Sequence, residues 1–396
     1  MMHMVDYNHC TACGACIQVC PQKCIVWEKQ EFGFRYPQFD ESQCTKCGLC
    51  SKVCPIPKKP LENQPLGAYA AVHLDPAILQ RSTSGGMFTA IATFVLAHNG
   101  FVYGCIMDEN FNIHHIGIDD VEELDKLRGS KYVQSDTLNT YNEVKYRLNQ
   151  GNLILYVGTP CQIAGLNKFL RKEYKNLITI DIICHGVGSQ DYFSKFVTFL
   201  NQYIGIIKEL KFRDKKYAGW SCGGGGGGVY FDSKKNTHHL FSFPSYKYYY
   251  YQYFLSGSIY RMSCYSCPYA SLHRQGDITL GDFWGVERLK LPIDTRDGCS
   301  LVLTNTDKGA ELLKALKNIQ LVPVSIKDAV KYNEQLSNPS RLPKNIRQKL
   351  INQYEVMDGI QIQAMYLKNH KKNILKGRLK ACIPYLLKLK LRKWLQ

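Results

Sequence analysis

The sequence has no long apolar segment. No uninterrupted apolar run reaches the length of about 20 residues that a membrane-spanning helix needs. Residues Met1 to Asn8 also lack the apolar core of a signal peptide. We therefore expect no spanning helix, no export and a cytoplasmic location.

Acidic residues are absent from the last part of the chain. Residues Tyr366 to Gln396 contain ten Lys or Arg and no Asp or Glu, although the whole chain has a net charge of +17. Much of the excess charge thus belongs to one tail, and we find no nucleic-acid-binding motif, so we expect no nucleic-acid partner. The segment from Ile383 to Leu395 mixes leucine with cations. It either lies peripherally on an anionic surface at the inner face of the cell membrane, where each basic residue contributes about 1 kcal/mol, or is solvated or docks a partner.

Disulfides are not expected either, although the chain has 17 cysteines, because an unexported protein uses cysteine for metal ligation. Two runs near the N-terminus share the spacing Cys-x2-Cys-x2-Cys-x3-Cys-Pro. This is the ligand run of bacterial [4Fe–4S] ferredoxins, in which the fourth cysteine of each run serves the other cluster. Zinc is the alternative, but zinc sites rarely combine this spacing with a Cys-Pro step. We expect one cluster on Cys10, Cys13, Cys16 and Cys54, and a second on Cys44, Cys47, Cys50 and Cys20.

After this module, apolar runs and amphipathic stretches alternate. Residues Pro55 to Pro60 predict a stiff, polar linker. The expected strands are 68–73, 101–107, 153–157 and 177–183, and the expected helices are 85–97, 120–127, 137–148, 160–171 and 189–200. This alternation predicts a largely parallel or mixed sheet.

Four further cysteines suggest a third cluster. Cys161 follows one predicted strand and Cys184 follows the next, so both are expected at the same carboxyl edge of the sheet if these strands are parallel neighbours. Cys264 and Cys267 form a later Cys-x2-Cys loop that could complete a four-thiolate site. Buried structural cysteines and a zinc-like pair are the alternative.

The best candidate for binding phosphate is the segment Ser82-Thr83-Ser84-Gly85-Gly86. Small hydroxyl residues and two glycines open a predicted helix there, where free amides and the helix dipole attract a diphosphate. Ordinary capping by Thr83 or Ser84 is the alternative.

Together these motifs resemble a known family, the beta subunit of coenzyme F-420-reducing hydrogenase and its flavoprotein relatives, some of which accompany exopolysaccharide biosynthesis. The resemblance extends over about residues 66–340. It is carried by Ser82–Gly86, Arg128–Ser135, Gly158–Gln162, Cys184–Gly186, Phe212–Lys215, Cys264-x2-Cys267 and Gly276–Gly285.

The resemblance implies FAD beside a [4Fe–4S] cluster on Cys161, Cys184, Cys264 and Cys267. Ser82, Thr83, Ser84, Gly85 and Gly86 would hold the FAD, and Lys131 would lie near the flavin, where a cation stabilises an anionic reduced ring. Gly158, Thr159 and Asp282 are the further expected contacts. His185, beside an expected ligand, is either a proton donor to the substrate or flavin or a structural neighbour of the cluster.

Two unusual segments have simpler interpretations. The six glycines from Gly223 to Gly228 lack the spacing of a phosphate loop and predict a flexible loop or a hairpin tip. The tyrosines Tyr246, Tyr248–Tyr251 and Tyr253 are either core and surface aromatics or an aromatic wall for a ring-shaped substrate.

The sequence therefore predicts an α+β protein with three parts. These are a two-cluster ferredoxin-like module (1–60), a mixed α/β domain for FAD and a cluster (61–340), and a basic, helical C-terminal tail (341–396). We expect an oxidoreductase that passes electrons from a ferredoxin-like donor to FAD and reduces a small or glycan-related substrate, as in polysaccharide biosynthesis. The alternatives are an electron-transfer subunit of a larger redox complex and a membrane-associated accessory protein of polysaccharide assembly. An oligomer is compatible with all three interpretations.

Overall fold

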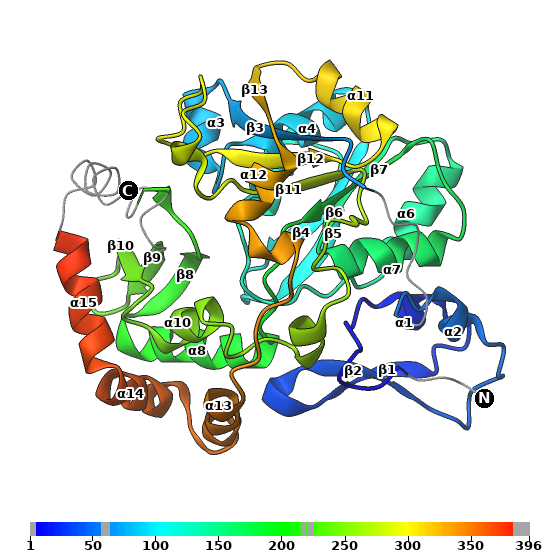
Figure 1. The fold of residues 1–396 in the computed structure, drawn as a ribbon. Helices are drawn as coiled ribbons and strands as arrows, with labels where there is room; N and C mark the ends of the chain where they lie inside the picture. The colour runs from blue at the N-terminus through cyan, green and yellow to red at the C-terminus, as the bar shows by residue number, and fades with distance from the viewer. Residues whose placement is uncertain (1–4, 57–63, 216–218, 221–224, 383–396) are drawn as a thin grey trace.

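The N-terminal module is a small unit at one end of the molecule (Figure 1). The computed structural model describes residues 5–56, 64–215, 219–220 and 225–382. The module contains α1 (Ala15–Val19), β1 (Ile25–Lys29), β2 (Arg35–Phe39) and α2 (Leu49–Val53), and its two strands pair antiparallel. Each cysteine run turns into its short helix at a glycine with positive φ, 81° at Gly14 and 70° at Gly48. Most of the predicted linker lies outside the described residues.

The central part is an eight-stranded mixed sheet in the order β13-β3-β12-β11-β7-β6-β4-β5. Its strands are β3 (Gly67–His73), β4 (Phe101–Met107), β5 (Ile113–Ile118), β6 (Ile154–Gly158), β7 (Leu177–Ile182), β11 (Ile278–Asp282), β12 (Ser300–Thr304) and β13 (Ile319–Val324). Neighbours within the series β4, β6, β7 and β11 pair in parallel, and the other pairs are antiparallel. The prediction of a mixed sheet is confirmed.

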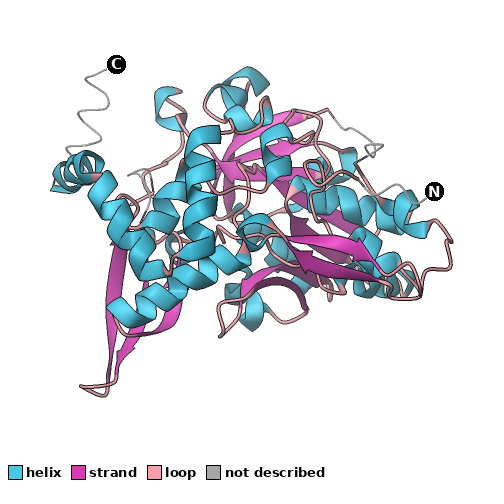
Figure 2. Ribbon diagram, turned by 90° about the horizontal axis from the view of Figure 1, so that it is seen from below, coloured by secondary structure: helices cyan, strands magenta, loops and turns pink. Residues whose placement is uncertain are grey.

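Helices cover both faces of this sheet, as the view from below also shows (Figure 2). They are α3 (Pro76–Arg81), α4 (Met87–Ala97), α5 (Leu124–Leu127), α6 (Thr140–Asn149), α7 (Pro160–Leu170), α11 (Asp307–Ala315) and α12 (Ile326–Lys331). Side chains along β6 alternate between two cores: Leu155 packs with α4, α5 and α11, whereas Ile154 and Tyr156 pack with α6 and α7. The second core also takes in Ala15 and Val53, so the N-terminal module is docked on the α6–α7 face.

The third part packs a small sheet against helices. It contains α8 (Gln190–Tyr203), β8 (Ile206–Lys211), β9 (Gly225–Asp232), β10 (Thr237–Pro244), α10 (Tyr249–Leu255), α13 (Lys344–Val356), α14 (Gly359–Asn369) and α15 (Lys371–Cys382). Tyr249, Tyr250 and Tyr251 are fully buried in an aromatic core with α8, which favours the structural interpretation of the tyrosine cluster. Residues 383–396, which carry the predicted surface-binding segment, lie outside the described residues. In the described part of the chain, no helix is both long enough and apolar enough to cross a bilayer.

Two local predictions are wrong. Gly225–Gly228 form the first half of β9 and are not a loop, because β8 and β10 lie against them on either side and the ring of Phe243 occupies the space that a side chain at Gly226 would need. Helix α4 is capped by Gly86, with φ of 85° and no side-chain hydrogen bond, and not by Thr83 or Ser84. The Ser84 hydroxyl instead donates to the Cys299 carbonyl, which ties the loop to the start of β12.

Candidate functional site

The carboxyl edge of the parallel strands carries the predicted third set of cysteines. Strand β6 ends at Gly158, and Cys161 lies in the first turn of α7. Strand β7 ends at Ile182, two residues before Cys184, and it pairs in parallel with β6. The two cysteines therefore reach the same edge through one strand–helix–strand unit, as the sequence predicts.

The later Cys-x2-Cys loop closes this site. Cys264 lies in the short helix η3 (Met262–Ser266) and Cys267 follows it. All four thiols line one partly open cavity, together with residues that include Thr11, His185, Arg261 and Tyr269. A site for a single metal ion needs at least three His, Cys, Asp or Glu side chains close together, and the described residues contain no such group. Four soft thiolate donors around a larger space fit a [4Fe–4S] cluster, which needs one ligand at each of its four irons.

Burial sets the protonation of these thiols. It raises the pKa of Cys184 well above its ordinary value, that of Cys264 to about 12 and that of Cys267 to about 11. The metal-free thiols are therefore protonated at neutral pH, and loading of iron must release protons. The Thr159 hydroxyl lies 3.1 Å from Cys161 Sγ and can donate to that sulfur once it is a thiolate.

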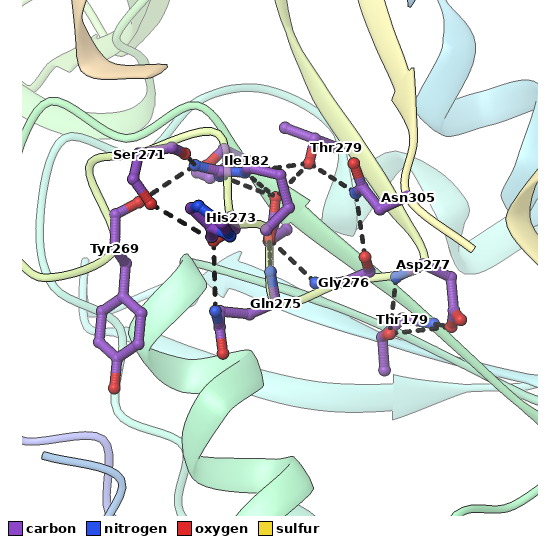
Figure 3. A network of polar contacts seen from close by, with 12 residues as sticks. Thr179, Ile182, Tyr269, Ser271, His273, Gln275, Gly276, Asp277, Thr279 and Asn305 are labelled. Carbon is purple, nitrogen blue, oxygen red and sulfur yellow. Dashed lines mark hydrogen bonds and ion pairs between the residues drawn. The ribbon is translucent and has the colours of Figure 1, made fainter. Parts of the chain in front are cut away.

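A buried ion pair fixes the loop that carries Cys267. Arg274 and Asp181 are 1% and 0% exposed, and Arg274 Nη2 lies 2.8 Å from Asp181 Oδ1. The Arg274 guanidinium also donates to the carbonyls of Tyr269 and Ser271, which follow Cys267. Figure 3 shows the surrounding network, in which Thr179 bonds Asp277 and Asn305 bonds Thr279. This network holds the Cys267 loop against the ends of β7 and β11.

The N-terminal cysteines gather in the two predicted sets. Cys10 interacts electrostatically with the three other members of the first set, Cys13, Cys16 and Cys54. Cys50 of the second set interacts in the same way with Cys16 and Cys54. Cys20, Cys44, Cys47 and Cys50 line a second cavity. Cys47 is exposed, so this second set lies at the outer end of the module.

A fifth cysteine lines the second cavity and was not predicted to act there. Cys24 is buried, and its Sγ lies 3.4 Å from that of Cys20. This hydrogen bond raises the pKa of Cys24 to about 12; burial alone would raise the pKa of Cys20, but the bond to Cys24 lowers it. Either sulfur can be the donor in the free thiols; once Cys20 ligates a cluster as a thiolate, only the Cys24 thiol can donate.

The module is fixed to the central sheet by contacts at the cysteines themselves. The hydroxyls of Tyr141 and Thr137 both donate to the Cys13 carbonyl, at 2.9 and 3.2 Å. A Cβ atom at Gly165 of α7 would lie 2.9 Å from Cys13 Sγ, so only glycine allows this approach. The first set thus lies directly against α7, the helix whose first turn carries Cys161.

Two side chains lie between the first and third sets. Tyr269 is within electrostatic range of Cys13 and Cys54 on one side and of Cys161 and Cys267 on the other, and its buried hydroxyl has no partner in the described residues. In Figure 3 its ring points away from the network that anchors its backbone. Arg261 faces Cys10, Cys161 and Cys264. The sequence analysis missed both residues, and their only signal is that each lies within three residues of the Cys-x2-Cys pair.

Comparison with known proteins identifies the family. The description "Coenzyme F420 hydrogenase/dehydrogenase, beta subunit" applies to two matching family models, the N-terminal one over residues 68–141 and the C-terminal one over residues 151–328. A 4Fe-4S dicluster domain matches residues 9–56. The chain belongs to the coenzyme F420 hydrogenase/dehydrogenase beta-subunit family.

Among solved structures, a chain of the F420-reducing [NiFe] hydrogenase complex from Methanosarcina barkeri, described in a xenon-derivatization study, is similar to this beta-subunit family member. The identity is 16% and the TM-score 0.44, over 75% of this chain and 92% of that chain. No curated protein matches the sequence.

Several residues that the resemblance to the beta-subunit family predicts as flavin contacts form hydrogen bonds with the protein itself. Lys131 Nζ donates to the carbonyls of Cys105 and Arg128, at 2.7 and 2.8 Å, and to two more carbonyls of the same turn. Burial lowers the pKa of Lys131. The Ser82 and Ser84 hydroxyls donate to carbonyls and the Gly85 amide donates to Ser300 Oγ, so these three groups of the predicted FAD loop are engaged within the protein.

The other predicted contacts lie along the same edge. Asp282, at the end of β11, pairs with Arg213 and accepts from Trp220 Nε1 at 2.8 Å. Gly158 and Thr159 lie in the turn before Cys161, where Thr159 caps α7. His185 lines the cavity of the third cysteine set, and its carbonyl accepts from Ser340 Oγ at 2.5 Å. The edge therefore runs from the predicted FAD loop past Asp282 to the third set of cysteines.

Proposed function

We propose that this protein is an electron-transfer subunit of a redox enzyme, in which the N-terminal module connects a partner protein to a flavin at the carboxyl edge of the sheet. The observation that carries the proposal is the succession of three four-thiol sets. It begins at the exposed Cys47, passes through the buried Cys13 and ends at Cys184. The family description, which names a beta subunit, supports a partner subunit in the same complex.

The residues fit the cofactors that this role requires. When bound, the clusters would supply one-electron transfer and FAD would convert it into two-electron chemistry. The residues that would hold the clusters are Cys10, Cys13, Cys16, Cys54; Cys20, Cys44, Cys47, Cys50; and Cys161, Cys184, Cys264, Cys267. The contacts of Tyr141, Thr137 and Gly165 keep the first set next to the third, so no movement of the module is needed for transfer between them.

A reductase of a small or glycan-related substrate is the second candidate. It is supported by the cavity around Cys161, Cys184, Cys264 and Cys267, whose lining also includes the polar residues His185, Gln335 and Ser340. A role in polysaccharide assembly would in addition need membrane contact through Ile383–Leu395. Liposome flotation of the protein with and without residues 368–396 tests that contact, and equal binding by both forms would exclude it.

Anaerobic reconstitution followed by iron, sulfide and flavin analysis tests the main proposal. Three clusters give about twelve irons per chain and two give about eight. Cys184→Ala should lose about four irons, whereas Cys299→Ala, which removes a buried cysteine outside the three sets, should keep them all. About eight irons in the wild type would refute the third cluster, and absence of flavin would refute the two-electron role. A screen of electron donors and acceptors, with and without organic substrates, separates the two candidates.

A further inference from the structure

Three arginines are buried in the described residues, and only one of them has no carboxylate partner. Arg274 pairs with Asp181, and Arg347 Nη2 lies 3.1 Å from Glu31 Oε1. Arg261, which is 2% exposed, forms no ion pair with a carboxylate in this part of the chain. Its Nε donates to Gln134 Oε1 at 2.6 Å and its Nη2 to the Arg35 carbonyl at 3.0 Å, while Nη1 has no partner.

Aromatic faces surround Arg261, and no Asp or Glu of the described residues forms an ion pair with it. Its guanidinium carbon lies 4.7 Å from the ring centroid of Phe34 and 4.3 Å from that of Tyr36. Such contacts compensate only part of the cost of removing a cation from water. A buried charge is normally neutralised by an opposite charge, so the negative partner of Arg261 has to be sought elsewhere.

The groups that face Arg261 are cysteines of two different sets. Arg261 lines the cavity of the third set with Cys161 and Cys264, and it is within electrostatic range of Cys10 in the first set. Hydrogen bonds also connect Arg261 to the backbone near a cysteine of each set. Its own N–H donates to the Val187 carbonyl, near Cys184, and Gln134, its side-chain partner, donates to the Thr11 carbonyl, next to Cys10.

We propose that Arg261 is the shared counter-ion of the first and third clusters. The inference rests on the proposed function, because it requires that both sets hold clusters. A thiolate-ligated cluster carries net negative charge, and a nearby cation favours the one-electron reduced form, which is more negative still. A single charge between the two clusters raises both reduction potentials together. It therefore leaves the difference between the two potentials nearly unchanged, whereas a charge beside only one cluster would alter that difference. In this role Arg261 is a positioning residue, because it acts through the charge of the two clusters.

The test is a redox titration, monitored by EPR, of the holo-protein and of Arg261→Gln, Arg261→Lys and Arg35→Gln. Arg35→Gln is the matched control, because it removes the charge of the residue whose carbonyl accepts from Arg261, but from a side chain that is 39% exposed and paired with Asp136. Arg261→Gln should shift the reduction equilibria of the first and third clusters about tenfold toward the oxidised form, which is about 59 mV for one electron. The outer cluster should shift much less. Arg261→Lys should stay close to the wild type.

Each outcome decides. Unmoved potentials in Arg261→Gln, or an equal shift in Arg35→Gln, would overturn the proposal. If Arg261→Gln does not retain iron, retention by Arg261→Lys supports a requirement for charge, and loss in both variants indicates a packing role and overturns it. The iron count of the wild type separates this inference from the function on which it rests. About eight irons would remove the third cluster, whereas about twelve irons with unmoved potentials would remove only the role of Arg261.

Discussion

Replacement of Asp181 by asparagine should release the loop that carries Cys267. Asp181 is fully buried and accepts hydrogen bonds from the amides of Gln275 and Gly276, at 2.8 and 3.0 Å, and from the Thr279 hydroxyl at 2.7 Å. Asparagine keeps the shape of this side chain but leaves the Arg274 guanidinium buried without a counter-charge. It also places an NH2 group where acceptor oxygens are needed.

The expected cost follows from this environment. Removal of one partner from a buried ion pair costs about 3–5 kcal/mol, because the other charge stays in the interior unpaired. Since 1.4 kcal/mol corresponds to a factor of ten, local opening of the loop should become about 10²–10⁴ times more frequent. The holo-protein should also lose about four irons, those held at Cys161, Cys184, Cys264 and Cys267, and keep those of the N-terminal module.

Hydrogen exchange measured by mass spectrometry under anaerobic conditions reports this opening in the peptide 268–282. The control is Asp294→Asn, which removes the acid of an ion pair with Arg296 whose side chains are 59% and 76% exposed; such pairs contribute about 0–1 kcal/mol. The double variant Asp181→Asn/Arg274→Met should recover much of the loss, because no charge is left unpaired. Unchanged exchange in Asp181→Asn, or additive losses in the double variant, would refute the reasoning.

Three further predictions concern other parts of the molecule. Gly165→Ala should displace Cys13, because the new methyl group would lie 2.9 Å from its sulfur, and EPR should show an altered or missing first cluster; an unchanged spectrum would contradict the tight docking. Cys24→Ala should leave about twelve irons but lower the reduction potential of the outer cluster, since Cys20 loses a hydrogen-bond donor that stabilises its negative charge; an unmoved potential would show that this bond is absent in the holo-protein. Burial lowers the pKa of His115 to about 4, below the unfolded value of about 6.5, so the unfolded chain binds more protons and the wild type should lose stability as pH falls from about 6.5 towards 4. His115→Phe should flatten this dependence in thermal unfolding, and parallel curves for the two proteins would contradict a buried neutral ring.

The two cysteine sets of the N-terminal module could be predicted, because the ligands of each cluster are close together in sequence apart from the exchanged fourth cysteine. The placement of Cys161 and Cys184 could also be predicted, since a strand–helix–strand unit has few possible geometries. Gly225–Gly228 could not, because their strand exists only through its neighbours in space. The sequence shows that these positions have no side chains, but it does not show that the ring of Phe243 fills the space beside Gly226.

The residues between the sets could not be predicted for a similar reason. Arg261 and Tyr269 face cysteines that are more than 200 residues away in sequence, and Arg274 meets Asp181 across 93 residues. Such contacts depend on how the module is docked on the sheet, and neither composition nor periodicity carries that information. The pattern therefore predicts which residues bind the clusters, but not which residues lie between them.

The exposure of Cys47 in the second cysteine set has a consequence for survival in air. Oxygen reaches an iron–sulfur cluster through its solvent-facing side, and Cys47 is the one exposed cysteine among the described ligands. The outermost cluster would be damaged first, while Cys13 and its neighbours are shielded by the sheet and by α7. If the proposed partner docks at this end, brief exposure to air would interrupt electron transfer at the second cluster before it harms the first, and repair of that one cluster would restore the connection.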